Sequence, residues 1–435
     1  MEVTTADEFF AVVEKSRLLT AAQVARARGA IYPSADAQTA AWSLVHQELI
    51  SRWQAGQLLA GRSSFYLGKY RLIGLLGRGG MGSVFLGQHV AMNRRVALKI
   101  ISRQSGKDPR SLERFLAEAR AVAALDHPNI VRAYSIDNEG DRYYFVMEYV
   151  EGIDLQRLVE AEGPLDLDRA VDYIRQAADG LDHAHQRNMI HCDVKPSNLL
   201  LNRFGVVKIL DLGLARFSGG EEPGSADLNQ YVLGSVDYLA PEQAMGSPTM
   251  DHRADIYALG CTLYFLMAGH PPFGAGSLSA RIIKQQTEPR PDIRAERPEV
   301  PADLAAICKK MMSKKPKNRY PSAAEVSRVL GDWRPPMSML RRAVAIPMAK
   351  LLDELDDETR PPEFAPKPIG ASRHSLGLIV IGLLVLVELL AFVLVIWGPR
   401  TPTNDETPAA TRKTVSAPET PHEPAAPEEP ADHSP

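Results

Sequence analysis

The chain has 435 residues, of which 45% are hydrophobic and 24% charged, the proportions of a globular protein that folds over most of its length. Its formal net charge is -3 and its basic residues form no single block, which argues against a nucleic-acid-binding surface. Three widely spaced cysteines argue against a disulfide framework or a zinc site and favour a reducing compartment.

Residues 1–69 have a helical pattern with two similar pieces, 18–23 and 49–54. Each piece ends in a capping box, Thr20 with Gln23 and Ser51 with Gln54, in which a hydroxyl and a glutamine satisfy the free amides at a helix start. We therefore expect two small helical hairpins. The sequence leaves open whether they form a regulatory or docking module, or an extension packed on the following domain.

A predicted strand, residues 70–76, leads into a glycine-rich segment with the pattern G-x-G-x-x-G-x-V. Glycines let a backbone approach a polyphosphate closely, and the valine can pack on an adenine ring. Residues 83–87 continue as a strand and not as a helix, which argues against a dinucleotide-binding fold. The candidate nucleotide-binding residues here are Leu76, Gly77, Arg78, Gly79, Gly80, Met81, Gly82, Ser83 and Val84.

A second predicted strand, residues 96–99, ends in Lys99, fifteen residues after Val84. The amine of Lys99 could pair with the phosphates of a nucleotide. A helical segment at 110–125 then carries Glu118, which could hold that lysine in place by an ion pair.

The segment from His191 to Asn198 places an aspartate, Asp193, two residues before Lys195 and five before Asn198. It resembles the catalytic loop of protein kinases, and with the preceding motifs it identifies residues 70–334 as a member of the eukaryotic-like (bacterial) serine/threonine protein kinase family. The resemblance implies that Asp193 accepts the proton of the attacking hydroxyl and that Lys195 steadies the phosphate. Asn198 and Asp211 would bind magnesium.

The resemblance also implies the fold and the cofactors. We expect an α+β, two-lobed protein kinase fold, with a small antiparallel-sheet lobe carrying one helix and a larger helical lobe, and with ATP and Mg²⁺ as cofactors. Residues 255–260 resemble the central helix of the large lobe, and Arg319 stands where the family pairs an arginine with the Glu242 position. At the interlobe hinge, backbone groups of Glu148 and Val150 would bond adenine, and Met147 would line the pocket behind it.

Two departures from the family pattern bear on regulation. Cys192 stands where the family most often has the arginine that receives a phosphorylated activation-loop residue. Residues 211–242 contain no threonine, and their aliphatic hydroxyls come from serines alone: Ser218, Ser225 and Ser235. We hypothesise that activation-loop phosphorylation is not the main switch.

After the kinase domain we expect a juxtamembrane linker (335–375), one transmembrane helix (376–397) and a disordered Pro/Glu-rich tail (398–435). The 22 residues from Leu376 to Trp397 are almost all apolar and would span about 33 Å as a helix, enough to cross a bilayer. Glu388 interrupts them. It is either tolerated in a sufficiently apolar span or pairs helices between two chains, as in a homodimer.

These features predict a single-pass protein of the cytoplasmic membrane with its kinase domain in the cytoplasm, where ATP is found. It would transfer the γ-phosphate of ATP to serine or threonine of cytosolic proteins and of itself. One alternative is a pseudokinase, a nucleotide-binding scaffold at the membrane. Another is an adaptor that acts chiefly through residues 1–69.

Overall fold

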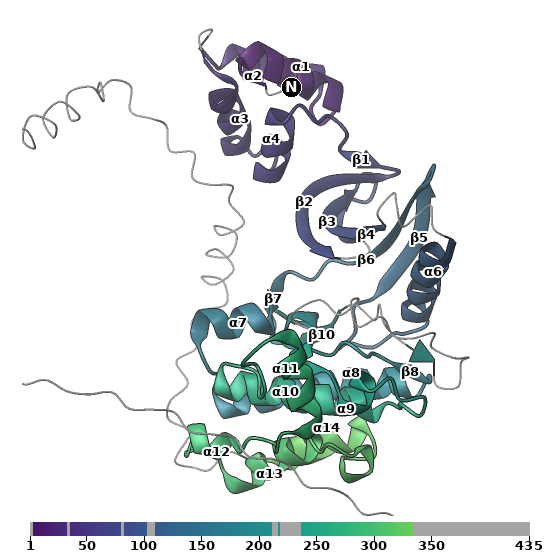
Figure 1. Cartoon of the computed structure of the whole chain (residues 1–435). Helices are drawn as coiled ribbons and strands as arrows, with labels where there is room; N and C mark the ends of the chain where they lie inside the picture. Colours follow the sequence, from purple (N-terminus) through teal and green to yellow (C-terminus); the bar gives the residue numbers. More distant parts are fainter. Residues whose placement is uncertain are drawn as a thin grey trace, which may run out of the picture. The chain divides into compact units, whose positions relative to one another are not determined.

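The computed structural model describes residues 3–32, 35–79, 82–101, 109–210, 216–217 and 236–334 (Figure 1). All of them belong to the first of two compact units, residues 1–363. The predicted linker (335–375), transmembrane helix (376–397) and tail (398–435) lie outside these ranges. Among the described residues, no helix is long and apolar enough to cross a membrane.

The chain begins with four short helices, which confirms the two predicted hairpins. Capping boxes start α2 and α4 as predicted, and Thr5 with Glu8 adds a third box before α1. The helices enclose a core of their own, with Phe9, Phe10 and Leu44 each at most 1% exposed. The bounds are α1 (Ala6–Ser16), α2 (Ala21–Gly29), α3 (Ala37–His46) and α4 (Arg52–Leu59).

A six-stranded antiparallel sheet follows, in the spatial order β1-β2-β3-β4-β6-β5. The predicted domain boundary at residue 70 falls inside this sheet, because β1 pairs with β2. Among the described residues between β4 and β5 there is one helix, α6 (Pro109–Ala123), as the fold prediction requires. The strands are β1 (Tyr66–Leu67), β2 (Tyr70–Gly79), β3 (Gly82–His89), β4 (Arg94–Ile101), β5 (Ala133–Glu139) and β6 (Arg142–Glu148).

The two faces of this sheet carry different layers, because successive side chains of a strand point to opposite faces. Leu98 and Ile100 lie in one apolar cluster with Tyr144, whereas Ile101 and Phe145 lie in the cluster that includes the buried side of α6. Lys99 alternates with Leu98 and Ile100, so it belongs to the face that α6 covers.

The rest of the described chain is mainly helical. Five short strands of the described chain lie in this lobe. β7 (Gly152–Asp154), β9 (Leu199–Asn202) and β10 (Val207–Ile209) form one sheet, and β8 (Met189–Ile190) pairs with β11 (Arg216–Phe217). The helices are α7 (Leu155–Glu162), α8 (Leu167–His185), α9 (Pro241–Ala244), α10 (Arg253–Ala268), α11 (Leu278–Thr287), α12 (Ile293–Glu296), α13 (Ala302–Met311) and α14 (Ala323–Asp332).

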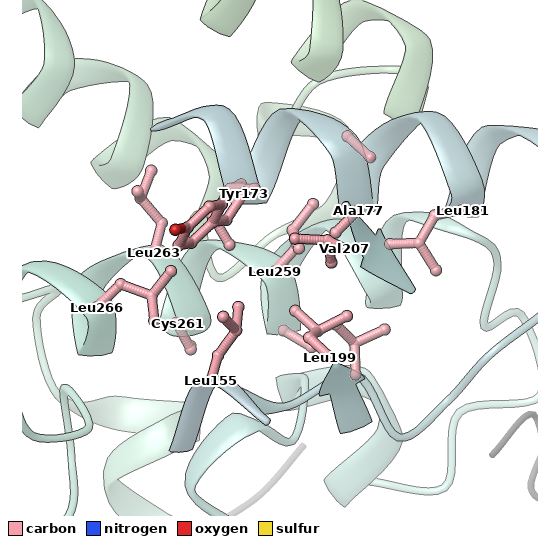
Figure 2. Close-up of a cluster of buried hydrophobic side chains, with 14 of the residues drawn as sticks. Leu155, Tyr173, Ala177, Leu181, Leu199, Val207, Leu259, Cys261, Leu263 and Leu266 are labelled. Carbon is pink, nitrogen blue, oxygen red and sulfur yellow. The ribbon is translucent and has the colours of Figure 1, made fainter. Parts of the chain in front are cut away.

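Helix α10 is the centre of this lobe, which confirms the predicted central helix. Its residues from Ala254 to Met267 are all buried, because the segment is apolar on every side and must be surrounded by other elements. Leu259 and Leu263 belong to one buried cluster with Tyr173 and Ala177 of α8 and with Leu199 of β9, and Leu263 lies beside the Tyr173 ring (Figure 2). The described residues therefore form a kinase-like arrangement of a sheet lobe and a helical lobe.

Candidate active site

Three of the predicted nucleotide-binding residues form one row across the sheet. Gly77 of β2 is the register partner of Val84 on β3, and Val84 is the partner of Lys99 on β4. Lys99 in turn lies opposite Phe145 of β6. Residues that are 7 and 15 positions apart in sequence are thus brought side by side by two antiparallel turns.

The glycine-rich segment is the hairpin between β2 and β3. Arg78 pairs with Ser83 and Gly79 with Gly82, while Gly80 and Met81 at the tip lie outside the described residues. A Cβ added at Gly82 would lie 1.9 Å from the carbonyl oxygen of Ile100, so only glycine fits there. At Gly77 an added Cβ would meet no atom within 4 Å, so packing does not explain that glycine.

The predicted partner of Lys99, Glu118, lies in α6 between the buried residues Phe115 and Val122. The helix therefore starts and ends where the sequence predicts, to within two residues. The side chain of Glu118 lies outside the described part of the chain, so its ion pair with Lys99 stays a prediction.

The predicted hinge follows the end of β6 at Glu148. Met147 lies between Ala97 of β4 and Ala133 of β5 in the register of the sheet. The N–H of Glu148 donates to the carbonyl of Arg132 at 2.9 Å, so this N–H is already engaged within the protein. The Glu148 carboxylate accepts a hydrogen bond from Lys208 of β10, also at 2.9 Å.

The catalytic-loop residues that the sequence singles out converge on one carboxylate. The Lys195 ammonium donates to Oδ2 of Asp193 at 2.7 Å, and the Asn198 amide nitrogen donates to the same oxygen at 3.0 Å and to the Asp193 carbonyl at 2.9 Å. The Asp193 and Lys195 side chains are each 17% exposed. Asp193 is thus oriented by two donors while part of its carboxylate remains open to solvent.

The backbone of this loop is anchored by Asp255, a role that the sequence analysis did not predict. One carboxylate oxygen of Asp255 accepts the N–H of Cys192 at 2.9 Å, and the other accepts the N–H of His191 and faces Nε2 of His185, both at 2.8 Å. Cys192 has φ of 65°, a left-handed conformation that non-glycine residues rarely adopt. Asp255 therefore stabilises a strained turn directly before Asp193.

Asp255 is 1% exposed, and its charge depends on these contacts. Burial alone would raise its pKa, but the hydrogen bonds with His185 and with the N–H of His191 outweigh burial and hold the pKa of Asp255 below its usual value. The anchor is consequently an ionised carboxylate at neutral pH.

The loop is also joined to the strand that precedes Asp211. The Nδ1 atom of His191 accepts the N–H of Asp193 at 3.2 Å, so Nε2 carries the ring proton and donates to the carbonyl of Leu210 at 2.9 Å. The N–H of Leu210 donates to the Asn198 carbonyl at 2.9 Å. The residue before Asp211 is fixed beside Asn198, and Asp211 itself lies outside the described residues.

The predicted pair of Glu242 with Arg319 is confirmed. The two side chains are 8% and 0% exposed, and a guanidinium nitrogen lies 2.7 Å from Oε2 of Glu242. The neighbouring Gln243 joins this segment to the catalytic loop, because its amide nitrogen donates to the Cys192 carbonyl at 2.9 Å. The serines of the activation segment, Ser218, Ser225 and Ser235, lie outside the described residues.

Known proteins similar to this chain are kinases. A family model described as "Protein kinase domain" matches residues 70–329, more than half of the chain. Serine/threonine-protein kinase PrkC of Bacillus subtilis is 37% identical over 259 residues, 60% of this chain and 39% of PrkC. Serine/threonine-protein kinase PknB of Mycobacterium tuberculosis is 38% identical over 263 residues, 59% of this chain and 42% of PknB.

The match thus spans less than half the length of either curated relative. Among solved structures, the PknI kinase domain of M. tuberculosis is 28% identical, covers 61% of this chain and 96% of that domain, and has a TM-score of 0.48.

Proposed function

Since this chain belongs to the eukaryotic-like (bacterial) serine/threonine protein kinase family, we propose that it transfers the γ-phosphate of ATP to serine or threonine hydroxyls of proteins. The observation that carries the proposal is the environment of Asp193. Its carboxylate is held by Lys195 and Asn198 in a loop whose backbone is anchored on a buried aspartate. The pseudokinase alternative has no observation in its favour.

In the proposed reaction Asp193 accepts the proton of the substrate hydroxyl as its oxygen attacks the γ-phosphorus. The bond between that oxygen and phosphorus forms, the bond from phosphorus to the β,γ-bridging oxygen breaks, and ADP leaves. Lys195, 2.7 Å from Asp193, places a positive charge where the transferring phosphoryl group gathers negative charge. Gly77, Val84 and Lys99 supply one row of the proposed ATP site.

The residues present fit magnesium as the accompanying ion. Because the amide nitrogen of Asn198 is engaged by Asp193, its amide oxygen is the atom left to bind a cation, and oxygen ligands are those that Mg²⁺ prefers. We propose Asp211 as the second ligand, next to the fixed Leu210. When bound, Mg²⁺ neutralises phosphate charge and holds the polyphosphate in line.

The test is phosphate transfer from labelled ATP with Mg²⁺ to a generic basic protein and to the chain itself, with Asp193→Asn beside the native protein. Transfer that is lost in the variant supports the proposal. Absence of transfer by the native protein, with ATP still bound, would refute it and support a nucleotide-binding scaffold.

We further propose that residues 376–397 anchor the protein in the cytoplasmic membrane, with the kinase domain and its substrates in the cytoplasm. The support is the apolar 22-residue stretch alone. Resistance of the native chain to alkaline extraction from membranes, and its loss on deletion of 376–397, would support the anchor. Extraction of both proteins alike would contradict it.

A further inference from the structure

The capping box at the start of α4 makes contacts that a helix cap does not require. As in any such box, the Ser51 hydroxyl accepts the N–H of Gln54 at 3.0 Å and Oε1 of Gln54 accepts the N–H of Ser51 at 2.9 Å. In addition, the Ser51 hydroxyl donates to the carbonyl of Ile73 at 2.5 Å, and the Gln54 amide nitrogen donates to the carbonyl of Leu72 at 2.7 Å. Both acceptors belong to β2.

The related box at α2 differs in this respect. The Thr20 hydroxyl donates back to Oε1 of Gln23 at 3.0 Å, and the N–H of Thr20 donates to the same oxygen at 2.9 Å. Both bonds lie at the surface of the helical module. Gln54, by contrast, is 4% exposed. Of these two related boxes, the one at α2 only caps a helix, and the one at α4 also binds a strand.

The contacts fall just beyond the segment of β2 that pairs with β1. Strand β1 pairs with Tyr70 and Arg71, and the N–H of Leu72 still reaches the carbonyl of Phe65 at 2.8 Å. At the next position the register with β3 shifts from Leu72 to Gly74, so Ile73 is the extra residue of a bulge. The carbonyls of Leu72 and Ile73, to which Gln54 and Ser51 donate, lie at this bulge, where an edge strand otherwise exposes unpaired groups.

Trp53 lies between the two box residues and packs α4 against β3. Its ring meets Phe65 edge-on with centroids 6.0 Å apart, and Phe85 of β3 with centroids 5.7 Å apart. It packs against both the core of the helical module and the apolar cluster of the sheet. Phe85 directly follows Val84, which points to the opposite face of β3 beside Lys99.

We propose that Ser51, Trp53 and Gln54 are positioning residues for the ATP site, so that residues 1–69 are a working part of the nucleotide-binding lobe. The strand that they hold at Leu72 and Ile73 runs on, through a second register shift between Leu75 and Gly77, to Gly79 of the glycine-rich hairpin. Fixing the bulge fixes the direction in which the hairpin leaves the sheet. This inference rests on the proposed ATP-dependent transfer.

The test uses the two boxes as a matched pair. Gln54→Glu keeps the acceptor that closes the box, because glutamate serves there as well as glutamine, but it cannot donate to the Leu72 carbonyl. Gln23→Glu makes the same change where the box contacts no strand carbonyl. We expect the KM for ATP and the Kd for a non-hydrolysable ATP analogue to rise roughly fivefold in the first variant, the usual lower limit for coupled sites, and to stay unchanged in the second. The KM for the protein substrate should not change in either.

A second pair, Gln54→Met and Gln23→Met, removes both boxes without burying a charge. The full chain is used throughout, and hydrogen exchange of the backbone amides of residues 70–79 is followed in parallel. Faster exchange in the Gln54 variants, and not in the Gln23 variants, supports the proposal even if the protein transfers no phosphate. The link between α4 and β2 is thus tested separately from the proposed activity. Equal nucleotide affinity and equal exchange in the Gln54 and Gln23 variants would overturn it.

Discussion

The buried ion pair between Arg319 and Glu242 should be the most sensitive electrostatic contact of the helical lobe. Arg319 is also bonded to three backbone carbonyls, those of Ser313, Arg253 and Lys314, at 2.7, 2.8 and 3.0 Å. Arg319→Met would leave the Glu242 carboxylate buried without its counterion and would leave these carbonyls unpaired. Breaking a buried pair in this way costs about 3–5 kcal/mol.

For a domain of this size, one kcal/mol lowers Tm by roughly 2–4 °C, so Arg319→Met should lower the Tm of the kinase domain by about 10 °C. The control is Arg328→Met, which removes an arginine that is 64% exposed and pairs with Glu325 and Asp332, and which should change stability by less than about 1 kcal/mol. Glu242→Gln should fall between them, because the amide still accepts a hydrogen bond. Calorimetry of the full chain would refute the reasoning if Arg319→Met and Arg328→Met melted within 2–3 °C of each other, a gap of only about 1 kcal/mol.

Three further outcomes are expected. Gly82→Ala should lower the unfolding free energy by roughly 1–3 kcal/mol, because the added Cβ collides with a strand carbonyl. Gly77→Ala should leave the unfolding free energy unchanged and weaken only ATP binding. Urea titration and an ATP-binding assay separate the two effects. Arg281→Asp or Asp237→Arg should break a largely buried 2.7 Å ion pair and lower the Tm, and the double reversal should restore it; no recovery would contradict this. Burial lowers the pKa of Lys314 to about 8 from 10.5, so the folded chain binds fewer protons than the unfolded chain between these two pH values. The unfolding free energy of the native protein should therefore rise with pH in this range, compared with that of Lys314→Met.

Several features of the fold follow from short stretches of sequence. The glycine-rich hairpin and the capping boxes at Thr20 and Ser51 were predicted at their observed places. Each depends on residue types and hydrogen bonds within a few residues, so the local pattern is sufficient. Residues 255–260 of the central helix were predicted through resemblance to the family. The pairing of Glu242 with Arg319, 77 residues apart, was predictable only through resemblance to a family.

Other features required the tertiary structure. Asp255 follows the catalytic loop by more than sixty residues and looks, in sequence, like an ordinary acid in the first turn of a helix. Likewise, Gln54 and Gln23 occupy equivalent positions in two similar segments, and nothing in those segments tells which one binds β2.

The sequence by itself therefore determined the family, the order of the elements and the residues of the proposed chemistry, because these depend on local spacing. Only the tertiary structure decided what holds that chemistry in place. Those partners, Asp255 for the loop before Asp193 and Gln54 for the strand before Gly77, were selected by which elements pack together, and close packing joins residues irrespective of their separation along the chain.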